Sequence, residues 1–196
     1  MKGLPAALPS TFLTRWALDL GVHPRDLYAW RDAGEVVELS RGVYRRADAP
    51  VASYPDLLAV CARAPRAVVC CVSAAVVHGL TDEPLSSVQV AVLKRTTPPR
   101  IGFPPTTVLR FDEATFELGL SSVEAAPGES VRIYGPARTV VDLMRLRHRF
   151  GEPIAYAALN RYLATPHARP AQVLGYAREL DALGPVRAAL DVASAR

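Results

Sequence analysis

The stretch PRDLYAWRDAGEVVELSRGVYRR, residues 24–46, decides how the N-terminal part of the chain should fold. It opens on Pro24, a residue that the first turn of a helix tolerates, and the apolar residues that follow are spaced to share one face. Gly34 is typical of a residue that ends a helix in the left-handed conformation. Beyond it, apolar and polar residues alternate on both sides of a Ser40-Arg41-Gly42 turn, which is the pattern of a β-hairpin. The stretch therefore predicts one short helix followed by two short strands.

The residues before this stretch predict another helix. From Thr11 onward the apolar residues follow helical spacing until Gly21, and a tight turn at residues 21–23 leads to Pro24. A helix, a tight turn, a second helix and a hairpin together make a winged helix-turn-helix. We therefore expect residues 1–50 to fold as a winged helix-turn-helix DNA-binding domain, with the helix from Pro24 as its recognition helix.

The charged side chains of this unit indicate which surface would face DNA. Residues 1–48 carry seven basic and six acidic side chains, so affinity for DNA requires the arginines to gather on one side. The expected DNA-facing residues lie on the recognition helix and on the wing: Arg25, Tyr28, Arg31, Arg41, Arg45 and Arg46. The alternative is a solvated helix face, on which Asp26 and Asp32 offset the two arginines of the helix.

The composition is that of a folded soluble protein with a small positive charge. Half of the 196 residues are hydrophobic, and the formal net charge is +4. All but two of the 23 basic residues are arginine, which suits phosphate contacts but fits a genomic base bias equally well. Three cysteines without a secretory signal indicate reduced thiols in a cytoplasmic protein. We expect no cofactor and no metal site, because the adjacent Cys70 and Cys71 cannot easily ligate one metal tetrahedrally. We expect no membrane partner, because the longest apolar run, residues 67–77, is shorter than the roughly 20 residues that span a bilayer.

A segment with two prolines, residues 47–55, is the natural boundary between a domain of residues 1–50 and a second one of residues 51–196. Patterns of both strands and helices follow it, so we expect an α+β chain whose second domain is mixed α+β and ends in a helical cluster. The expected strands cover residues 67–72, 87–93, 106–111 and 130–134, the first of which also reads as part of a helix. The expected helices cover residues 56–63, 73–80, 136–149, 154–163 and 170–190, the second one capped by Ser73.

Three segments, in this order and spacing, resemble the AbiEi-type antitoxins, which are transcriptional regulators of bacterial toxin–antitoxin pairs. They are Gly34–Arg46, Ser73–Leu80 (SAAVVHGL) and Gly135–Met144 (GPARTVVDLM). The resemblance implies a winged-helix domain that binds inverted repeats in its own promoter and represses transcription. It also implies a C-terminal antitoxin domain that counteracts a nucleotidyltransferase-like toxin, directly or functionally. Independently of the resemblance, we expect no enzymatic activity, because the residues lack the carboxylate–lysine cluster that a nuclease requires.

Two other functions remain open. One is a winged-helix regulator whose second domain binds a ligand or dimerises, without any toxin. The other is a nuclease-related enzyme, which would need clustered carboxylates beside a lysine to hold a metal. Lys94 follows an apolar strand that lacks the required acidic residue, and Asp112 with Glu113 falls in an expected loop, so the sequence argues against this function.

His78, in the second resembling segment, could serve as a general base with Asp82 or Glu83. No serine or cysteine nucleophile is placed beside it by a recognisable turn. We therefore interpret His78 as a structural histidine that is hydrogen-bonded at a helix end.

The third resembling segment begins a helix that is rich in arginine. Arg138 and Asp142 are four residues apart, so we expect them to form a local ion pair. We also expect one face of this helix to form an arginine ridge that is largely solvated and partly available to a protein partner or to DNA: Arg138, Arg145, Arg147 and Arg149.

Overall fold

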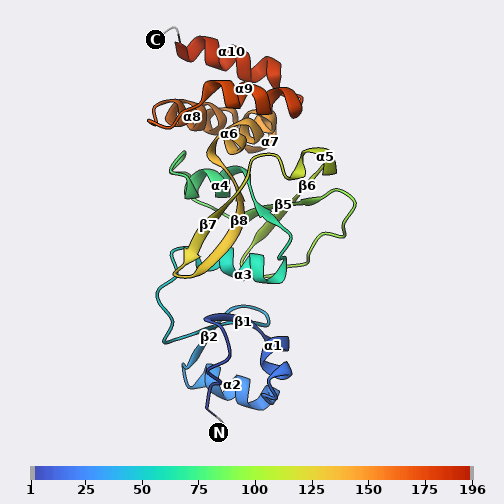
Figure 1. The fold of residues 1–196 in the computed structure, drawn as a ribbon, viewed down its shortest axis with the longest axis vertical. Coiled ribbons are helices and arrows are strands. Elements are labelled where there is room, and N and C mark those ends of the chain that lie inside the picture. Colours follow the sequence, from blue (N-terminus) through green and yellow to red (C-terminus); the bar gives the residue numbers. More distant parts are fainter. Residues whose placement is uncertain (1–2, 195–196) are drawn as a thin grey trace.

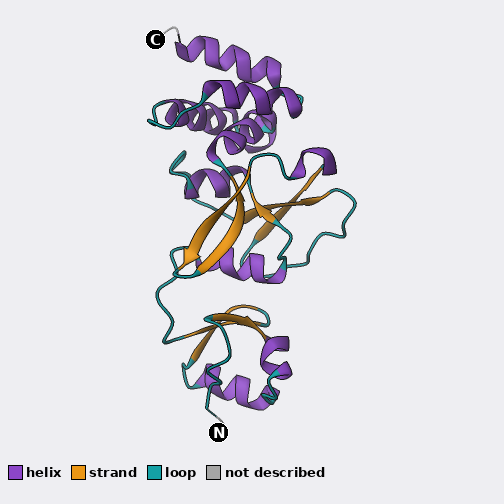
Figure 2. Cartoon of the chain, in the orientation of Figure 1, coloured by secondary structure: helices purple, strands orange, loops and turns teal. Residues whose placement is uncertain are grey.

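The computed structural model describes residues 3–194 and shows an elongated molecule of mixed helices and strands (Figure 1). A small N-terminal unit lies at one end, a five-stranded sheet in the middle and a layer of helices at the other end (Figure 2). The expected α+β class is therefore confirmed. Within the described residues, no helix combines the length and apolar character of a membrane span.

The N-terminal unit combines two helices with a three-stranded antiparallel sheet. Its elements, in chain order, are β1 (Thr11–Leu13), α1 (Thr14–Asp19), α2 (Pro24–Asp32), β2 (Val36–Ser40) and β3 (Val43–Arg46). The strand order is β1-β3-β2. The helix expected from Thr11 begins only at Thr14, because residues 11–13 instead pair with residues 43–45 of β3. That pairing joins segments about 30 residues apart, which local spacing cannot reveal.

The second helix and the hairpin form where the sequence predicts them. Pro24 is the first residue of α2, and the His23 side chain caps the helix by accepting a hydrogen bond from the backbone N–H of Arg25. Gly34 and Gly42 have φ angles of +74° and +76°, a conformation that glycine adopts without a Cβ clash. They end the helix and close the hairpin turn, respectively. The unit has its own core, which includes Phe12, Leu27, Trp30 and Tyr44.

The central sheet has the strand order β6-β5-β4-β8-β7. Its strands are β4 (Val68–Val69), β5 (Val88–Leu93), β6 (Thr106–Phe111), β7 (Leu120–Ala126) and β8 (Glu129–Tyr134). β5 runs parallel to β6 and β4 parallel to β8, whereas β4 is antiparallel to β5 and β7 to β8. The strands expected at residues 87–93, 106–111 and 130–134 are confirmed. β7 was not expected, because its serine-rich, largely exposed residues carry no strand pattern.

Three helices belong to the part of the chain that forms this sheet: α3 (Pro55–Arg63), α4 (Cys71–Val77) and α5 (Glu113–Phe116). α4 begins at Cys71, and Ser73 does not cap it as expected. The Ser73 hydroxyl instead accepts a hydrogen bond from the backbone N–H of Gln89 in β5, at 2.9 Å. Ser73 therefore joins the helix to the sheet.

The helical cluster at the C-terminal end consists of α6 (Pro136–Arg145), α7 (Arg147–Phe150), α8 (Glu152–Leu163), α9 (Pro170–Glu179) and α10 (Leu183–Ser194). The helices expected at residues 136–149 and 170–190 are each divided in two, at Leu146 and at residues 180–182. α6 packs against α4, α8 and α9. One continuous core joins this cluster to α4 and to the sheet, so the two layers of the second part fold as one body.

Candidate nucleic-acid interface

The outer face of α2 presents the three residues expected to face DNA. Arg25 and Arg31 are exposed, and Tyr28 is 52% exposed. Leu27 and Trp30 lie on the opposite face and are buried in the core of the N-terminal unit. Helical geometry with one buried stripe thus fixes the direction of the polar side chains.

The Arg31 guanidinium lies over the Tyr28 ring, 5.2 Å from its centroid. It also forms ion pairs with Asp32 at 2.9 Å and with Glu38 of β2 at 3.6 Å. The hydrogen bond to Asp32 raises the pKa of this guanidinium further, so its charge is permanent. The carboxylates reduce the positive potential of the helix face, and Arg31 must leave Asp32 before it can contact a phosphate fully.

The hairpin turn exposes the Arg41 side chain but is held at its backbone by the second part of the chain. Arg63 of α3 donates a hydrogen bond to the carbonyl oxygen of Arg41, and the Ser40 hydroxyl donates one to that of Phe103. Within the unit, the backbone N–H of Thr14 donates to the carbonyl oxygen of Gly42 at 3.0 Å. The turn therefore does not project freely, as a long wing would.

Arg45 lies elsewhere than expected. It is 7% exposed, and its guanidinium donates to the Thr11 hydroxyl and to the Pro50 carbonyl oxygen and pairs with Glu129 of β8. The expectation that Arg45 lies on the outer surface of the wing is thus corrected: β3 is the central strand of its sheet, and α1 and α2 lie on one side of that sheet while α3 lies on the other (Figure 1).

Arg46 is partly buried and has an acidic partner of its own. Its guanidinium pairs with Asp48 at 2.9 Å and lies 3.4 Å from the carbonyl oxygen of Pro5. The hydrogen bond from Arg46 lowers the pKa of the Asp48 carboxyl. Among the three expected wing arginines, Arg41 is thus the one whose side chain is both exposed and beside the turn.

Two arginines beside Arg41 were not expected at this surface. A cleft of about 350 Å³ lies between the hairpin turn, the start of α1 and the end of α3, and three arginines line it: Arg15, Arg41 and Arg63. None of the described residues that line it is acidic. The pairing of β1 with β3 brings Arg15 to the turn, so only knowledge of that pairing could have revealed this cluster.

The sequence of the chain was also compared with known protein families. Residues 8–47 match the family of transcriptional regulators described as AbiEi antitoxin. The resemblance to AbiEi-type antitoxins is thereby confirmed. The match spans β1 to β3 and covers about a fifth of the chain. No curated protein matched the chain.

Two of the three segments that resemble AbiEi antitoxins, residues 73–80 and 135–144, lie outside the matched residues. Within the second of them, Arg138 pairs with Asp142 at 2.9 Å, as expected. However, both side chains have no exposed surface. The Arg138 guanidinium lies 4.3 Å from the centroid of the Tyr134 ring and also donates to the carbonyl oxygens of Thr115 and Leu118.

The four arginines expected to form a ridge on this helix do not share one exposed face, because Arg138 is buried. Arg145 is partly buried and shares Asp142 with Arg138, at 2.9 Å. Arg147 pairs with Glu152 at 3.5 Å. Arg149 is exposed and lies over the ring of Phe150. α6 packs against α4, α8 and α9. Arg138, the third residue of α6, therefore points into the core rather than into solvent.

His78 is a structural histidine, as interpreted from the sequence. It follows the last residue of α4, and its Nε2 lies 2.7 Å from the carbonyl oxygen of Tyr134. Burial lowers the pKa of His78. Asp82, considered as its catalytic partner, instead pairs with Arg161 of α8.

No group of three or more histidine, cysteine, aspartate or glutamate side chains that could hold a metal occurs among residues 3–194. The three cysteines are free thiols. Lys94 pairs with Asp112 at 3.3 Å and Arg95 with Glu113 at 2.6 Å. These are exposed ion pairs at the ends of two parallel strands, β5 and β6.

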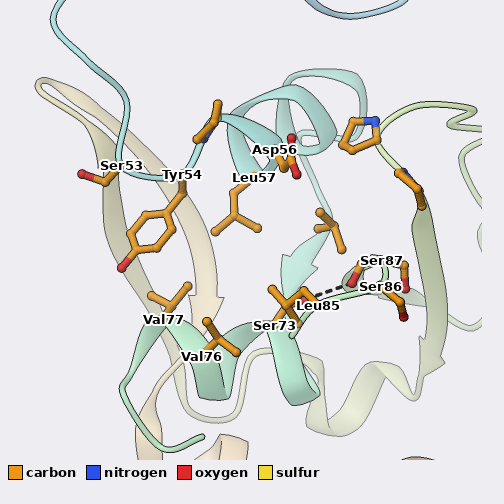
Figure 3. A pocket seen from close by; sticks show the side chains of 14 residues that line it. Ser53, Tyr54, Asp56, Leu57, Ser73, Val76, Val77, Leu85, Ser86 and Ser87 are labelled. Carbon is orange, nitrogen blue, oxygen red and sulfur yellow. Dashed lines mark hydrogen bonds between the residues drawn. The ribbon is translucent and has the colours of Figure 1, made fainter. Parts of the chain in front are cut away.

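A separate pocket of about 240 Å³ lies between α3, α4 and the loop before β5 (Figure 3). Tyr54, Leu57 and Val76 contribute apolar surface, and the Ser73 hydroxyl lies 3.5 Å from the carbonyl oxygen of Ser87. No basic side chain is among its described lining residues, whereas Asp56 is one of them. The described lining of this pocket offers no positive charge to a phosphate, so we do not include the pocket in the candidate nucleic-acid interface.

Proposed function

We propose that this chain is a DNA-binding autorepressor and antitoxin whose N-terminal unit is a winged helix-turn-helix. The observation that supports this most directly is the exposed row of Arg25, Tyr28 and Arg31 on α2, within a segment that matches transcriptional regulators. The order strand, helix, helix, hairpin, with β1 paired to β3, supports this proposal, because it places a hairpin directly after the proposed recognition helix.

In this proposal α2 enters the major groove of each half of an inverted repeat in the chain's own promoter. Arg25 and Arg31 contact base edges or phosphates, and Tyr28 contacts the backbone or a thymine methyl group. Arg41 adds a phosphate contact beside the groove, and Arg46 adds another when it leaves Asp48. Arg45 is not included, because its guanidinium is buried.

We further propose two functional domains, residues 1–50 for DNA binding and residues 51–196 for antitoxin activity. The second domain would counteract a nucleotidyltransferase-like toxin in the bacterial cytoplasm. Of the arginines first expected to contact a partner, Arg149 is the exposed one, and Arg145 and Arg147 are partly accessible. Arg138 is excluded, since it has no exposed surface.

A gel-shift experiment tests DNA binding. The full chain should shift a fragment of its own promoter, and the double substitution Arg25→Glu with Arg31→Glu should abolish the shift. Arg178→Glu, an exposed arginine on α9, serves as the matched control and should bind as the wild type does. Equal binding by the double variant and the wild type would overturn the assignment of α2.

A growth assay tests the antitoxin activity separately. The full chain, co-expressed with a nucleotidyltransferase-like protein encoded beside it, should restore growth, and the Arg25→Glu/Arg31→Glu variant should also restore it. If neither protein restores growth, the antitoxin proposal fails while DNA binding can still hold. If only the wild type does, the neutralisation acts through the promoter rather than through the second domain.

A further inference from the structure

The two resembling segments that DNA binding does not use meet at one carbonyl group. The Tyr134 carbonyl oxygen, just before the segment of residues 135–144, lies 2.7 Å from Nε2 of His78 in the segment of residues 73–80. The Thr139 hydroxyl donates to the same oxygen at 3.1 Å. The end of α4 and the start of α6 are therefore held side by side, although about 60 residues separate them.

A cavity of about 400 Å³ opens where these segments meet. Its walls come from the segment that follows α4, from α6 and α8, from the loop between α8 and α9, and from the first turn of α9. Among its apolar lining residues Pro136 is exposed, whereas Leu80 and Ala137 are buried, and His78, Arg169 and Gln172 supply polar groups. This volume and this mixture of a mostly apolar wall with a few polar groups are those of a small-molecule site.

The charge of the cavity favours an anionic ligand. Arg169 contributes a permanent positive charge, and none of the described lining residues is acidic. Thr165, His167 and Gln172 add further hydrogen-bonding side chains at the same rim. Arginine offers a planar fork of donors that matches the oxygen atoms of a phosphate.

The loop that carries Arg169 is held in place by a buried tyrosine. Tyr162, on α8, is 4% exposed and lines the cavity. Its hydroxyl accepts a hydrogen bond from the backbone N–H of Arg169 at 3.0 Å, and its carbonyl oxygen accepts one from the Thr165 hydroxyl at 2.7 Å. The position of Arg169 at the rim is thus fixed by the fold, although its side chain is exposed.

We propose that this cavity binds a small phosphate ester of the nucleotide class, with the phosphate at Arg169 and Gln172 and the less polar part against Pro136. The cavity is large enough for such a molecule, and Pro136 is an exposed apolar residue against which a ring can pack. Two helices, α6 and α9, also begin at the cavity, and their N-terminal ends add to the positive potential there. The proposed phosphate site depends on Arg169 and the cavity, not on these helix ends. This ligand site goes beyond the proposed function, which requires none.

Calorimetric titration of the full chain at low salt tests the proposal. Each of the four ribonucleoside 5′-monophosphates is compared with its nucleoside and with inorganic phosphate. At least one monophosphate should bind at least tenfold more tightly than its nucleoside. Arg169→Gln should weaken that binding at least tenfold, whereas the control Arg178→Gln, at the far end of α9, should leave it unchanged. Gel shifts with the same proteins should remain normal, which separates this test from the test of DNA binding.

Several outcomes decide between the possible ligands. Inorganic phosphate that binds as tightly as the best nucleotide overturns the nucleotide assignment, because the less polar part of the ligand would then add nothing to the binding. The proposal is overturned if no monophosphate binds, if nucleosides bind equally well, or if Arg169→Gln and Arg178→Gln behave alike. It is also overturned if the Arg25→Glu/Arg31→Glu variant loses nucleotide binding, because the nucleotide would then occupy the DNA-binding face.

Discussion

Arg45 of the N-terminal unit forms an ion pair with Glu129 of the central sheet, across the junction between the two parts of the chain. The arginine is almost fully buried, and the side chain of Glu129 is 20% exposed. Taking two charges out of water is costly, and the cost is recovered only while both partners are present. The stability of the whole molecule thus depends on a contact between its two parts.

Substitution of Glu129 by glutamine should destabilise the folded chain. Arg45 would keep its hydrogen bonds to Thr11 and Pro50 but would lose its counter-ion, so we expect a loss of about 3 kcal/mol, the lower end of the range for a broken buried pair. Equilibrium unfolding in urea measures it. Asp48→Asn, which removes the partner of Arg46 at an exposed site, should change the unfolding free energy little. Equal effects of the two substitutions would contradict the structural role of Arg45.

Substitution of Arg41 by alanine should weaken promoter binding through the loss of one phosphate contact. The slope of log K against log salt concentration should fall by about 1. Arg187→Ala, on the exposed face of α10, is the control and should leave the slope as it is. A slope that stays the same in both variants would show that Arg41 makes no phosphate contact.

Gly119 should tolerate alanine far less well than Gly128 does. Both have φ angles above +70°, so each substitution costs about 1 kcal/mol or slightly more in backbone strain. At Gly119, however, an added Cβ would lie 2.6 Å from the Cβ of Arg138, whereas at Gly128 it would meet nothing within 4 Å. We expect Gly119→Ala to cost a further 1–3 kcal/mol through overpacking, measured by urea unfolding. Equal losses at the two glycines would argue against the tight packing of Arg138.

Acid should destabilise the protein through His78. Burial makes the pKa of His78 lower in the folded protein than its usual 6.5, so the unfolded chain takes up a proton first as the pH falls. The unfolding free energy should therefore decrease from about pH 7 towards pH 5. The slope in this window should flatten in His78→Gln and persist in His148→Gln, an exposed control. The lowered pKa of Asp82 acts in a separate window, below about pH 4.

The thiols should be unreactive in the folded protein. Burial raises the pKa of Cys61 to about 12 and raises that of Cys70 as well, and the thiolate is the reactive form. A disulfide reagent at pH 8 should therefore label neither Cys70 nor Cys71 on mixing, since both have no exposed surface, and should label all three thiols after unfolding in guanidinium. Rapid labelling of Cys70 or Cys71 in the native protein would contradict their burial.

Local features of the sequence were sufficient to predict α2, the hairpin and the strands β5, β6 and β8. Each of them depends on spacing within a few residues, on a proline or glycine at an end, or on β-branched residues. The pair between Arg138 and Asp142 was likewise predictable, because four residues on one helix are always neighbours. The exposed residues of α2 follow from the same helical spacing.

Predictions from the sequence were wrong where contacts between distant segments determine the secondary structure or the burial of a residue. Thr11 begins a strand because residues 11–13 pair with β3. Alternation predicts one solvent-facing side for a hairpin, yet three successive residues of β3, Val43 to Arg45, are buried, since both faces of this sheet are covered. Arg138 is buried because several helices surround α6. A charged side chain is usually exposed, but it can be buried where the fold places an oppositely charged partner beside it in the core.

The hairpin turn held by Arg63 and Phe103 would set the geometry of the proposed complex on DNA. The proposed recognition helix α2 lies at one end of an elongated molecule and the helical cluster at the other (Figure 1), so the rotation of the bound half-site would set the direction in which the cluster points. Two copies on half-sites one helical turn apart, about 34 Å, would extend from the same side of the duplex. Insertion of half a turn between the half-sites would place them on opposite sides, so the spacing of the repeat would decide whether the C-terminal parts of neighbouring copies can meet.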